Sequence, residues 1–130
     1  MAPERQLGFL WGTVAVALVA LSPLAPRFAS AAPSCPVKTF AGFPCPGCGT
    51  TRAALALADF DFAAAFAVSP LAAAAWCGLI LGGLAAGALA LSGRGVPPWP
   101  QPTGARDLAL RFAVVGAVAA NWVYLVLHGT

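Results

Sequence analysis

Three cysteines lie close together in the first half of the chain. Cys35, Cys45 and Cys48 fall within 14 residues of a 130-residue sequence that holds four cysteines in all. The last two form a C-x-x-C pair around Pro46 and Gly47. Proline fixes one backbone dihedral and glycine frees another, so this pair is suited to a tight turn. Thiols at such spacing form disulfides, bind metals or exchange with other disulfides.

The first hypothesis is a structural disulfide. Outside the cytoplasm close cysteines are oxidised by default, so we predict a bond from Cys35 to Cys45 or Cys48. Closing a loop of about ten residues would stabilise the fold by roughly 2 to 4 kcal/mol. One thiol of the three then remains unpaired. Cys77 could be its partner only if the loop dipped into a bilayer.

The second hypothesis is a zinc site. C-P-x-C-G sequences recur in zinc sites, where backbone N–H groups donate to the sulfurs. Zinc needs a fourth ligand beside Cys35, Cys45 and Cys48, and His128 is the one histidine of the chain. A lone histidine at a chain end is more often simply solvated. Zinc is therefore the one cofactor for which the sequence offers ligands.

The third hypothesis is thiol–disulfide exchange. Thr50 or Thr51 is expected to cap a short helix from about Arg52 to Ala58, which places Cys48 just before a helix N-terminus. The helix dipole and the Arg52 cation would favour the thiolate. Arg52 is also expected to donate to carbonyls of the turn or to pair with Asp59 or Asp61.

Other catalytic sets are missing from the sequence. It holds no serine–histidine–acid set, no H-E-x-x-H and no phosphate-binding glycine loop, and the strand that usually precedes a redox C-x-x-C helix is absent. The question of catalysis stays open, and a non-catalytic role is favoured.

The composition predicts a membrane protein. Hydrophobic residues make up 60% of the chain, charged residues 8%, and the mean hydropathy is +0.84. A soluble globule of this size could not cover so much apolar surface. The six arginines and one lysine are scattered, so we expect no nucleic-acid partner. No internal repeat appears, and one membrane domain covering 1–130 is the simplest organisation.

Three segments are long and apolar enough to cross a bilayer, which defines an all-α integral membrane fold. They cover residues 7–24, 70–91 and 108–127. Ser69 and Pro70 should begin the second span as N-cap and first helical residue. Gly82, Gly83 and Gly87 could let another helix approach that span, or could simply reflect the abundance of glycine. In the third span only Asn121 requires a partner within the protein, since Arg111 lies near one end and Trp122 and Tyr124 suit an interface.

Two loops join these spans. Residues 33–68 carry the cysteines and short interfacial helices, the second capped by Asp59 or Asp61 and bearing apolar aromatic rings at Phe60, Phe62 and Phe66. Residues 92–107 are proline-rich and predict an extended spacer.

The first span has a second interpretation. The apolar run and Ala29-Ser30-Ala31 are similar to a signal peptide with its cleavage site, but the run is long for one and Pro23 and Pro26 interrupt it, so we expect retention. Arginines and lysine are slightly more numerous around the N-terminus and residues 92–107 than around the cysteine loop. This bias favours a cytoplasmic N-terminus and an extracytoplasmic cysteine loop.

The loop resembles a known family. The sequence Phe40-Ala-Gly-Phe-Pro-Cys45-Pro-Gly-Cys48-Gly-Thr-Thr-Arg52 is similar to the motif of the bacterial membrane proteins catalogued as domain of unknown function 2752. Ala58 stands where that family usually has glycine, and Ser69 where it usually has asparagine. The resemblance implies a membrane location and an important cysteine motif. The motif positions around the cysteines are Pro44, Pro46, Gly47, Gly49, Thr51 and Arg52.

Together these observations predict an accessory or interaction subunit of the bacterial cytoplasmic membrane. Its expected surroundings are the lipid bilayer and either a second copy of the chain or another membrane protein, because a small bundle with a glycine-rich face suits helix association.

Overall fold

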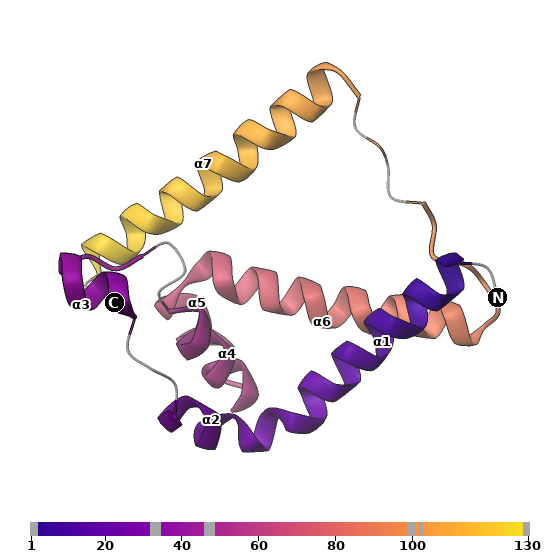
Figure 1. Cartoon of the computed structure of the whole chain (residues 1–130), viewed down its shortest axis with the longest axis horizontal. Coiled ribbons are helices and arrows are strands. Elements are labelled where there is room, and N and C mark those ends of the chain that lie inside the picture. Colours follow the sequence, from indigo (N-terminus) through magenta and orange to yellow (C-terminus); the bar gives the residue numbers. More distant parts are fainter. Residues whose placement is uncertain (1–2, 32–34, 46–48, 99–100, 102, 129–130) are drawn as a thin grey trace.

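The computed structural model describes residues 3–31, 35–45, 49–98, 101 and 103–128. In this part of the chain all regular structure is helical, which confirms the predicted all-α class. The helices are α1 (Pro3–Leu21), a 3₁₀ turn η1 (Ser22–Leu24), α2 (Ala25–Ala31), α3 (Pro36–Ala41), α4 (Thr50–Ala58), α5 (Phe62–Val68), α6 (Pro70–Leu91) and α7 (Ala105–Leu127). Figure 1 shows α3 beside the end of α7, α4 and α5 by the start of α6, and α2 at the end of α1.

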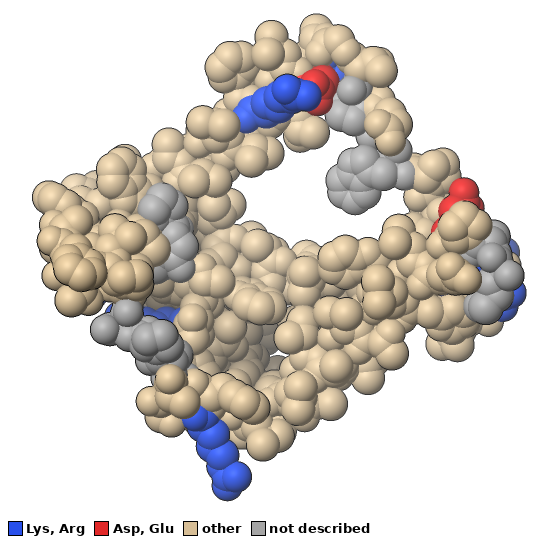
Figure 2. All heavy atoms as spheres, in the orientation of Figure 1, with Lys and Arg blue, Asp and Glu red and all other residues tan. Residues whose placement is uncertain are grey.

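Three helical stretches of the described chain are long and apolar enough to cross a membrane. They are Pro3–Phe28, Pro70–Leu91 and Ala105–Leu127. Figure 2 shows charged side chains near the ends of the long helices and an uncharged surface between them. This distribution suits a bilayer, whose hydrocarbon core makes charges costly and apolar surface free of cost. The chain therefore has the architecture of a multi-pass membrane protein.

Two of the long helices begin earlier than the sequence predicted. Helix α1 begins at Pro3 rather than at residue 7, because proline is well tolerated in a first turn and Arg5 finds a partner in the Ala90 carbonyl at 3.3 Å. Helix α7 begins at Ala105 rather than at residue 108, so the proline-rich spacer is three residues shorter than expected. The carboxylate of Asp107 lies 2.8 Å from the guanidinium of Arg111, one turn later. This ion pair neutralises the arginine near the end of the span.

Glycines bring α1 and α6 into backbone contact. A Cβ atom built on Gly12 would lie 2.7 Å from Gly87 Cα, and one built on Gly83 would lie 2.8 Å from the Trp11 carbonyl oxygen. Gly8 is similarly close to the Ala86 carbonyl, at 2.9 Å. Each helix thus presents a G-x-x-x-G pair to the other, the arrangement that membrane helices use for close approach. The predicted close packing of α6 is confirmed at Gly83 and Gly87, whereas a Cβ atom built on Gly82 would meet nothing within 4 Å.

Helix α7 diverges from the α1–α6 pair. Its residues 105–106 and 108–120 are exposed, and Figure 1 shows it separating from α6 along its length. The two helices meet near the C-terminal end of α7. There Asn121 is 6% exposed and its Oδ1 accepts from Ser69 Oγ and from the Leu71 backbone N–H, both at 3.2 Å. The prediction that Asn121 needs a protein partner is confirmed.

Local caps explain where the short helices begin and end. Ser69 accepts from Ala72 N–H and Asp61 accepts from Ala64 N–H, as predicted for α6 and α5. The expected cap of α4 was wrong. Gly49 is its N-cap, with φ +93°, and Thr50 is already its first residue. Ala58 is the last residue of α4, so a helical backbone explains why alanine fits there.

Candidate functional site: the cysteine loop

Two of the predicted cysteines meet. Cys35 is the N-cap residue of α3, and its Sγ lies 3.5 Å from Cys45 Sγ. Helix α3 forms because Pro36 fits a first helical position and Gly42, with φ +73°, ends it in the left-handed conformation. The helix folds the chain back, so residues ten apart in sequence come into sulfur–sulfur contact. Both side chains are half-buried.

The other predicted ligands are placed differently. Pro46, Gly47 and Cys48 lie outside the described residues. His128 stacks on Tyr124, with 4.0 Å between ring centroids, and its Nδ1 lies 2.9 Å from the Tyr124 carbonyl oxygen. Among the residues that the structure describes, no three histidine, cysteine or acidic side chains are gathered as for a metal ion. The structure therefore brings Cys35 and Cys45 together without His128.

Helix α4 follows directly on the motif. It begins two residues after Cys48, which agrees with the expected position of a helix N-terminus. Gly49 is required there, because its φ of +93° disfavours any side chain and a Cβ would lie 3.3 Å from Val68 Cγ1. Thr51 and Arg52 are exposed on α4. Among the described residues no ion pair joins Arg52 to Asp59 or Asp61. The alternative partners of Arg52, the carbonyls of the turn, include residues outside the described part of the chain, so that part stays a prediction.

Aromatic side chains of the long helices hold the loop backbone. Trp122 Nε1 donates to the Pro44 carbonyl at 2.8 Å, and Trp76 Nε1 donates to the Thr50 carbonyl at 3.3 Å. Tyr124 Oη donates to the Ala67 carbonyl at 2.7 Å. Pro44 itself is buried.

Sequence reasoning missed these three bonds. It assigned Trp122 and Tyr124 to the membrane interface, where both residue types are enriched. The useful signal was that indole and phenol donors near a helix end find acceptors in any loop that covers that end.

Cys77 is separate from the motif. It lies about two turns into α6, is half-buried and is joined to no other described cysteine. The sequence allowed Cys77 to pair with the odd loop thiol only if the loop dipped into the bilayer, and Cys48 lies outside the described residues.

The fold and the loop define a class: small multi-pass helical membrane proteins with a cysteine motif above the membrane helices. The sequence model of the family described as "Protein of unknown function (DUF2752)" matches residues 35–83, which confirms the resemblance stated from the motif. The match covers the cysteine motif, α4, α5 and α6 as far as Gly83. No curated protein and no solved structure matches the chain.

Proposed function

We propose that the cysteine loop is a disulfide-bonded structural cap over the extracytoplasmic ends of the helices, and that the chain is a non-catalytic accessory subunit of the bacterial cytoplasmic membrane. The single observation that carries this proposal is the 3.5 Å separation of Cys35 Sγ and Cys45 Sγ. A small side-chain rotation brings such a pair to the roughly 2.05 Å of a disulfide. The two thiols would lose two protons and two electrons to a disulfide-bearing oxidant through thiol–disulfide exchange.

The bonds from the long helices support a structural role. The Cys35–Cys45 segment includes Pro44, whose carbonyl is the acceptor for Trp122 on α7. A cross-link at Cys45 would restrain the backbone next to that acceptor. It would also reduce the conformational entropy that the unfolded loop gains, which is how disulfides stabilise in the chain-entropy account.

The arrangement of the helix ends determines which charged residues share one side of the membrane. The first residues of α1 and the last of α6 lie together, as the Arg5 bond to Ala90 indicates, and the cysteine loop lies at the other end of α6 (Figure 1). Under this orientation Arg5, Arg94 and Arg106 would face the cytoplasm, and the cations on the other side would be Arg27, Lys38 and Arg52. Arg111, in the first turns of α7, gives the cytoplasmic side the slight excess that the positive-inside rule favours. The loop would then face an oxidising compartment.

Retention of the first span is part of the proposal. Helix α1 supplies Gly8 and Gly12 to the backbone contact with α6. Cleavage after Ala31 would remove that partner and expose the glycine face of α6 to lipid. Since the face formed by Gly83 and Gly87 is already covered by α1, association with another chain would use a different surface, such as the exposed apolar side of α7.

Intact-mass measurement of the full chain, purified after thiol blocking with N-ethylmaleimide, tests the disulfide. We expect two cysteines, Cys35 and Cys45, to escape blocking until the protein is reduced. Cys35→Ser and Cys45→Ser should each lower stability by roughly 2 to 4 kcal/mol, and the double variant should cost little more, because coupled residues are non-additive. Cys77→Ser is the matched control and should leave stability unchanged.

Two other outcomes would replace the proposal. Stoichiometric zinc that is lost in Cys48→Ser, with destabilisation by a chelator, would identify a metal centre whose binding energy is folding energy. Accumulation of a mixed disulfide with another protein in Cys45→Ser or Cys48→Ser, with normal stability, would identify an exchange pair.

A further inference from the structure

The segment 35–45, which carries two of the motif cysteines, is held against the long helices at Pro44. Residues 36–43, which include α3, are all exposed, and Pro44 is the one buried residue of the segment. The Pro44 carbonyl accepts from Trp122 Nε1 on α7 at 2.8 Å. The position of the segment therefore depends on this bond to α7.

Trp122 holds the end of the segment at which the sulfurs meet. Pro44 directly precedes Cys45, whose Sγ lies 3.5 Å from Cys35 Sγ. Cys35 is fixed from its own side, because its carbonyl accepts from Thr39 N–H at 3.1 Å and from Thr39 Oγ1 at 3.0 Å in the first turn of α3. While Pro44 is held, each sulfur is at a high effective concentration near the other. Once Pro44 is released, Cys45 can move away from Cys35.

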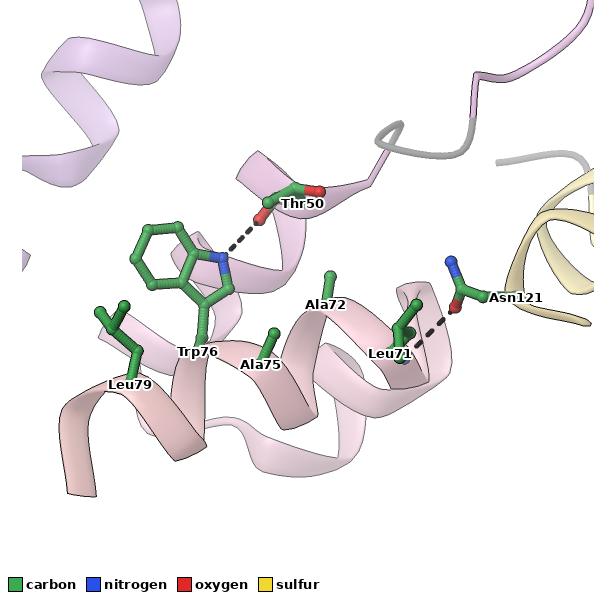
Figure 3. Close-up of a pocket in the computed structure, with 7 residues that line it drawn as sticks. All are labelled: Thr50, Leu71, Ala72, Ala75, Trp76, Leu79 and Asn121. Carbon is green, nitrogen blue, oxygen red and sulfur yellow. Dashed lines mark hydrogen bonds between the residues drawn. The ribbon is translucent and has the colours of Figure 1, made fainter. Parts of the chain in front are cut away.

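The same bond helps to hold α7. Residues 108–120 of this helix are exposed, and its described side-chain hydrogen bonds to other elements involve Asn121, Trp122 and Tyr124. Asn121 bonds to the start of α6 (Figure 3) and Tyr124 bonds to α5. Trp122 is the member of this group that bonds to the cysteine segment. It therefore links the position of α7 to the geometry of the two thiols.

We propose that Trp122 and the Cys35–Cys45 pair form a redox-sensitive latch, in which oxidation of the pair strengthens the Trp122–Pro44 bond and reduction weakens it. The latch rests on the proposed disulfide and adds its regulation. On oxidation the two thiols lose two protons and two electrons to a low-molecular-weight disulfide. One S–S bond forms between the cysteines, and the S–S bond of the oxidant breaks to give two thiols.

Reciprocity makes the latch measurable from both ends. If the Trp122–Pro44 bond favours the disulfide by some factor, the disulfide must favour the bond by the same factor, because coupling free energies are reciprocal. A bond that served only to stabilise the fold would be equally strong in both redox states, and this factor would be one.

The exchange equilibrium with glutathione tests the latch on the full chain in detergent. After equilibration at defined ratios of glutathione to glutathione disulfide, thiol blocking and peptide mass spectrometry give the oxidised fraction of Cys35 and Cys45. We expect Trp122→Phe to lower the exchange constant by roughly three- to tenfold, the value of one hydrogen bond. An unchanged constant would refute the latch.

Tyr124→Phe is the matched control on the same turn of α7. It removes a 2.7 Å bond to the Ala67 carbonyl, which belongs to α5 rather than to the cysteine segment. We expect it to lower thermal stability about as much as Trp122→Phe and to leave the exchange constant unchanged. An equal fall in the constant for the two variants would refute the latch, because general loosening of α7 would explain both.

The reciprocal effect is measured at the indole itself. NMR spectroscopy of protein with isotope-labelled tryptophan follows each Nε1–H, and Trp122→Phe assigns the Trp122 signal. Reduction should speed solvent exchange at Trp122 by the same factor. Trp76, which donates to the Thr50 carbonyl outside the segment 35–45 (Figure 3), should not change. No acceleration at Trp122, or equal acceleration at Trp76, would refute the latch.

Failure of the latch and failure of the structural cap are separate results. The intact mass of the purified wild type reports whether Cys35 and Cys45 are bonded, whereas the exchange constant reports whether Trp122 favours that bond. A bonded pair whose constant is the same in Trp122→Phe would support the cap and refute the latch. A constant that Trp122→Phe lowers, in a protein purified with both thiols reduced, would support the latch and refute the cap.

Discussion

Individual hydrogen bonds from side chains of the long helices hold the backbone of the cysteine loop in place. Trp122 illustrates this, because the residue is 43% exposed while its Nε1 donates to the Pro44 carbonyl at 2.8 Å. The residue therefore does two things: it presents apolar surface to the membrane and fixes the backbone beside Cys45. Removing the N–H while keeping an aromatic ring separates these roles.

Trp122→Phe should destabilise the protein by about 1 kcal/mol, the net value of a hydrogen bond whose acceptor is left without a donor. It should also raise the rate at which an alkylating reagent modifies Cys45 in the reduced protein. Trp11→Phe is the control, because Trp11 is equally exposed, at 44%, and its indole donates no bond in the described chain. Thermal unfolding in detergent measures the first effect. Equal shifts in both variants would show that loss of ring area, rather than the bond, is responsible.

At this scale the sequence predicted residues whose role is local or whose polarity demands a partner. Ser69 and Asp61 cap helices because their side chains reach backbone N–H groups three residues ahead. Asn121 was recognised because a buried amide in a membrane helix must be satisfied. Gly49 was missed as the cap of α4, because threonine and glycine are about equally common N-caps and the sequence does not show that the backbone at residue 49 has a φ of +93°.

At the scale of helices, glycine positions decide which elements touch. Gly12 on α1 faces Gly87 on α6, Gly8 faces Ala86 and Ala90, and Gly83 faces Trp11 and Ala15, all at distances that leave no room for a Cβ. The glycines of α6 were recognised from the sequence, but their partner was not. The reason is that a G-x-x-x-G pair shows that a helix can be approached closely without showing which helix approaches it.

Gly12→Val should weaken the α1–α6 pair by about 1 to 3 kcal/mol or more, since its Cβ would lie 2.7 Å from Gly87 Cα and the backbones must separate. Gly82→Val makes the same chemical change on α6 where nothing lies within 4 Å, so it should be close to neutral. Unfolding in mixed micelles with increasing sodium dodecyl sulfate measures both. A loss in Gly82→Val as large as in Gly12→Val would contradict the assigned interface.

Long helices were predictable and short ones only in part. Helices α6 and α7 were predicted from their long apolar runs, because few structures other than membrane-spanning helices contain such runs. Helices α4 and α5 were expected from their caps and apolar residues. Helix α3 was not, although Pro36 at its start and Gly42 after its end are the usual pair of terminal residues. Six helical residues carry too little periodicity to be recognised without those signals.

At the scale of the molecule, the sequence predicted three spans but not their arrangement. Composition gives each span its length, and it gives no reason for α7 to diverge while α1 and α6 cross in contact (Figure 1). The exposed face of α7 is apolar along its length, with Val114, Val115 and Val118 among its exposed residues. In a bilayer that surface faces either lipid tails or another helix. Both surroundings are apolar, so the hydrophobic effect favours neither over the other.

Three spans require that the cysteine loop and the C-terminus share one side of the membrane and that the proline-rich loop lies on the other. Figure 1 agrees, because the end of α7 lies beside α3 and the N-terminus lies far from both.

With the native cysteines replaced by serine, Phe43→Cys and His128→Cys should react with a membrane-impermeant maleimide on intact cells. Both positions are exposed. Pro98→Cys should react only after permeabilisation, because the slight excess of arginine beside it favours the cytoplasm. The reverse pattern would place the cysteine loop in a reducing compartment, which favours zinc over a disulfide. Labelling at residue 43 without labelling at residue 128 would mean that α7 does not cross.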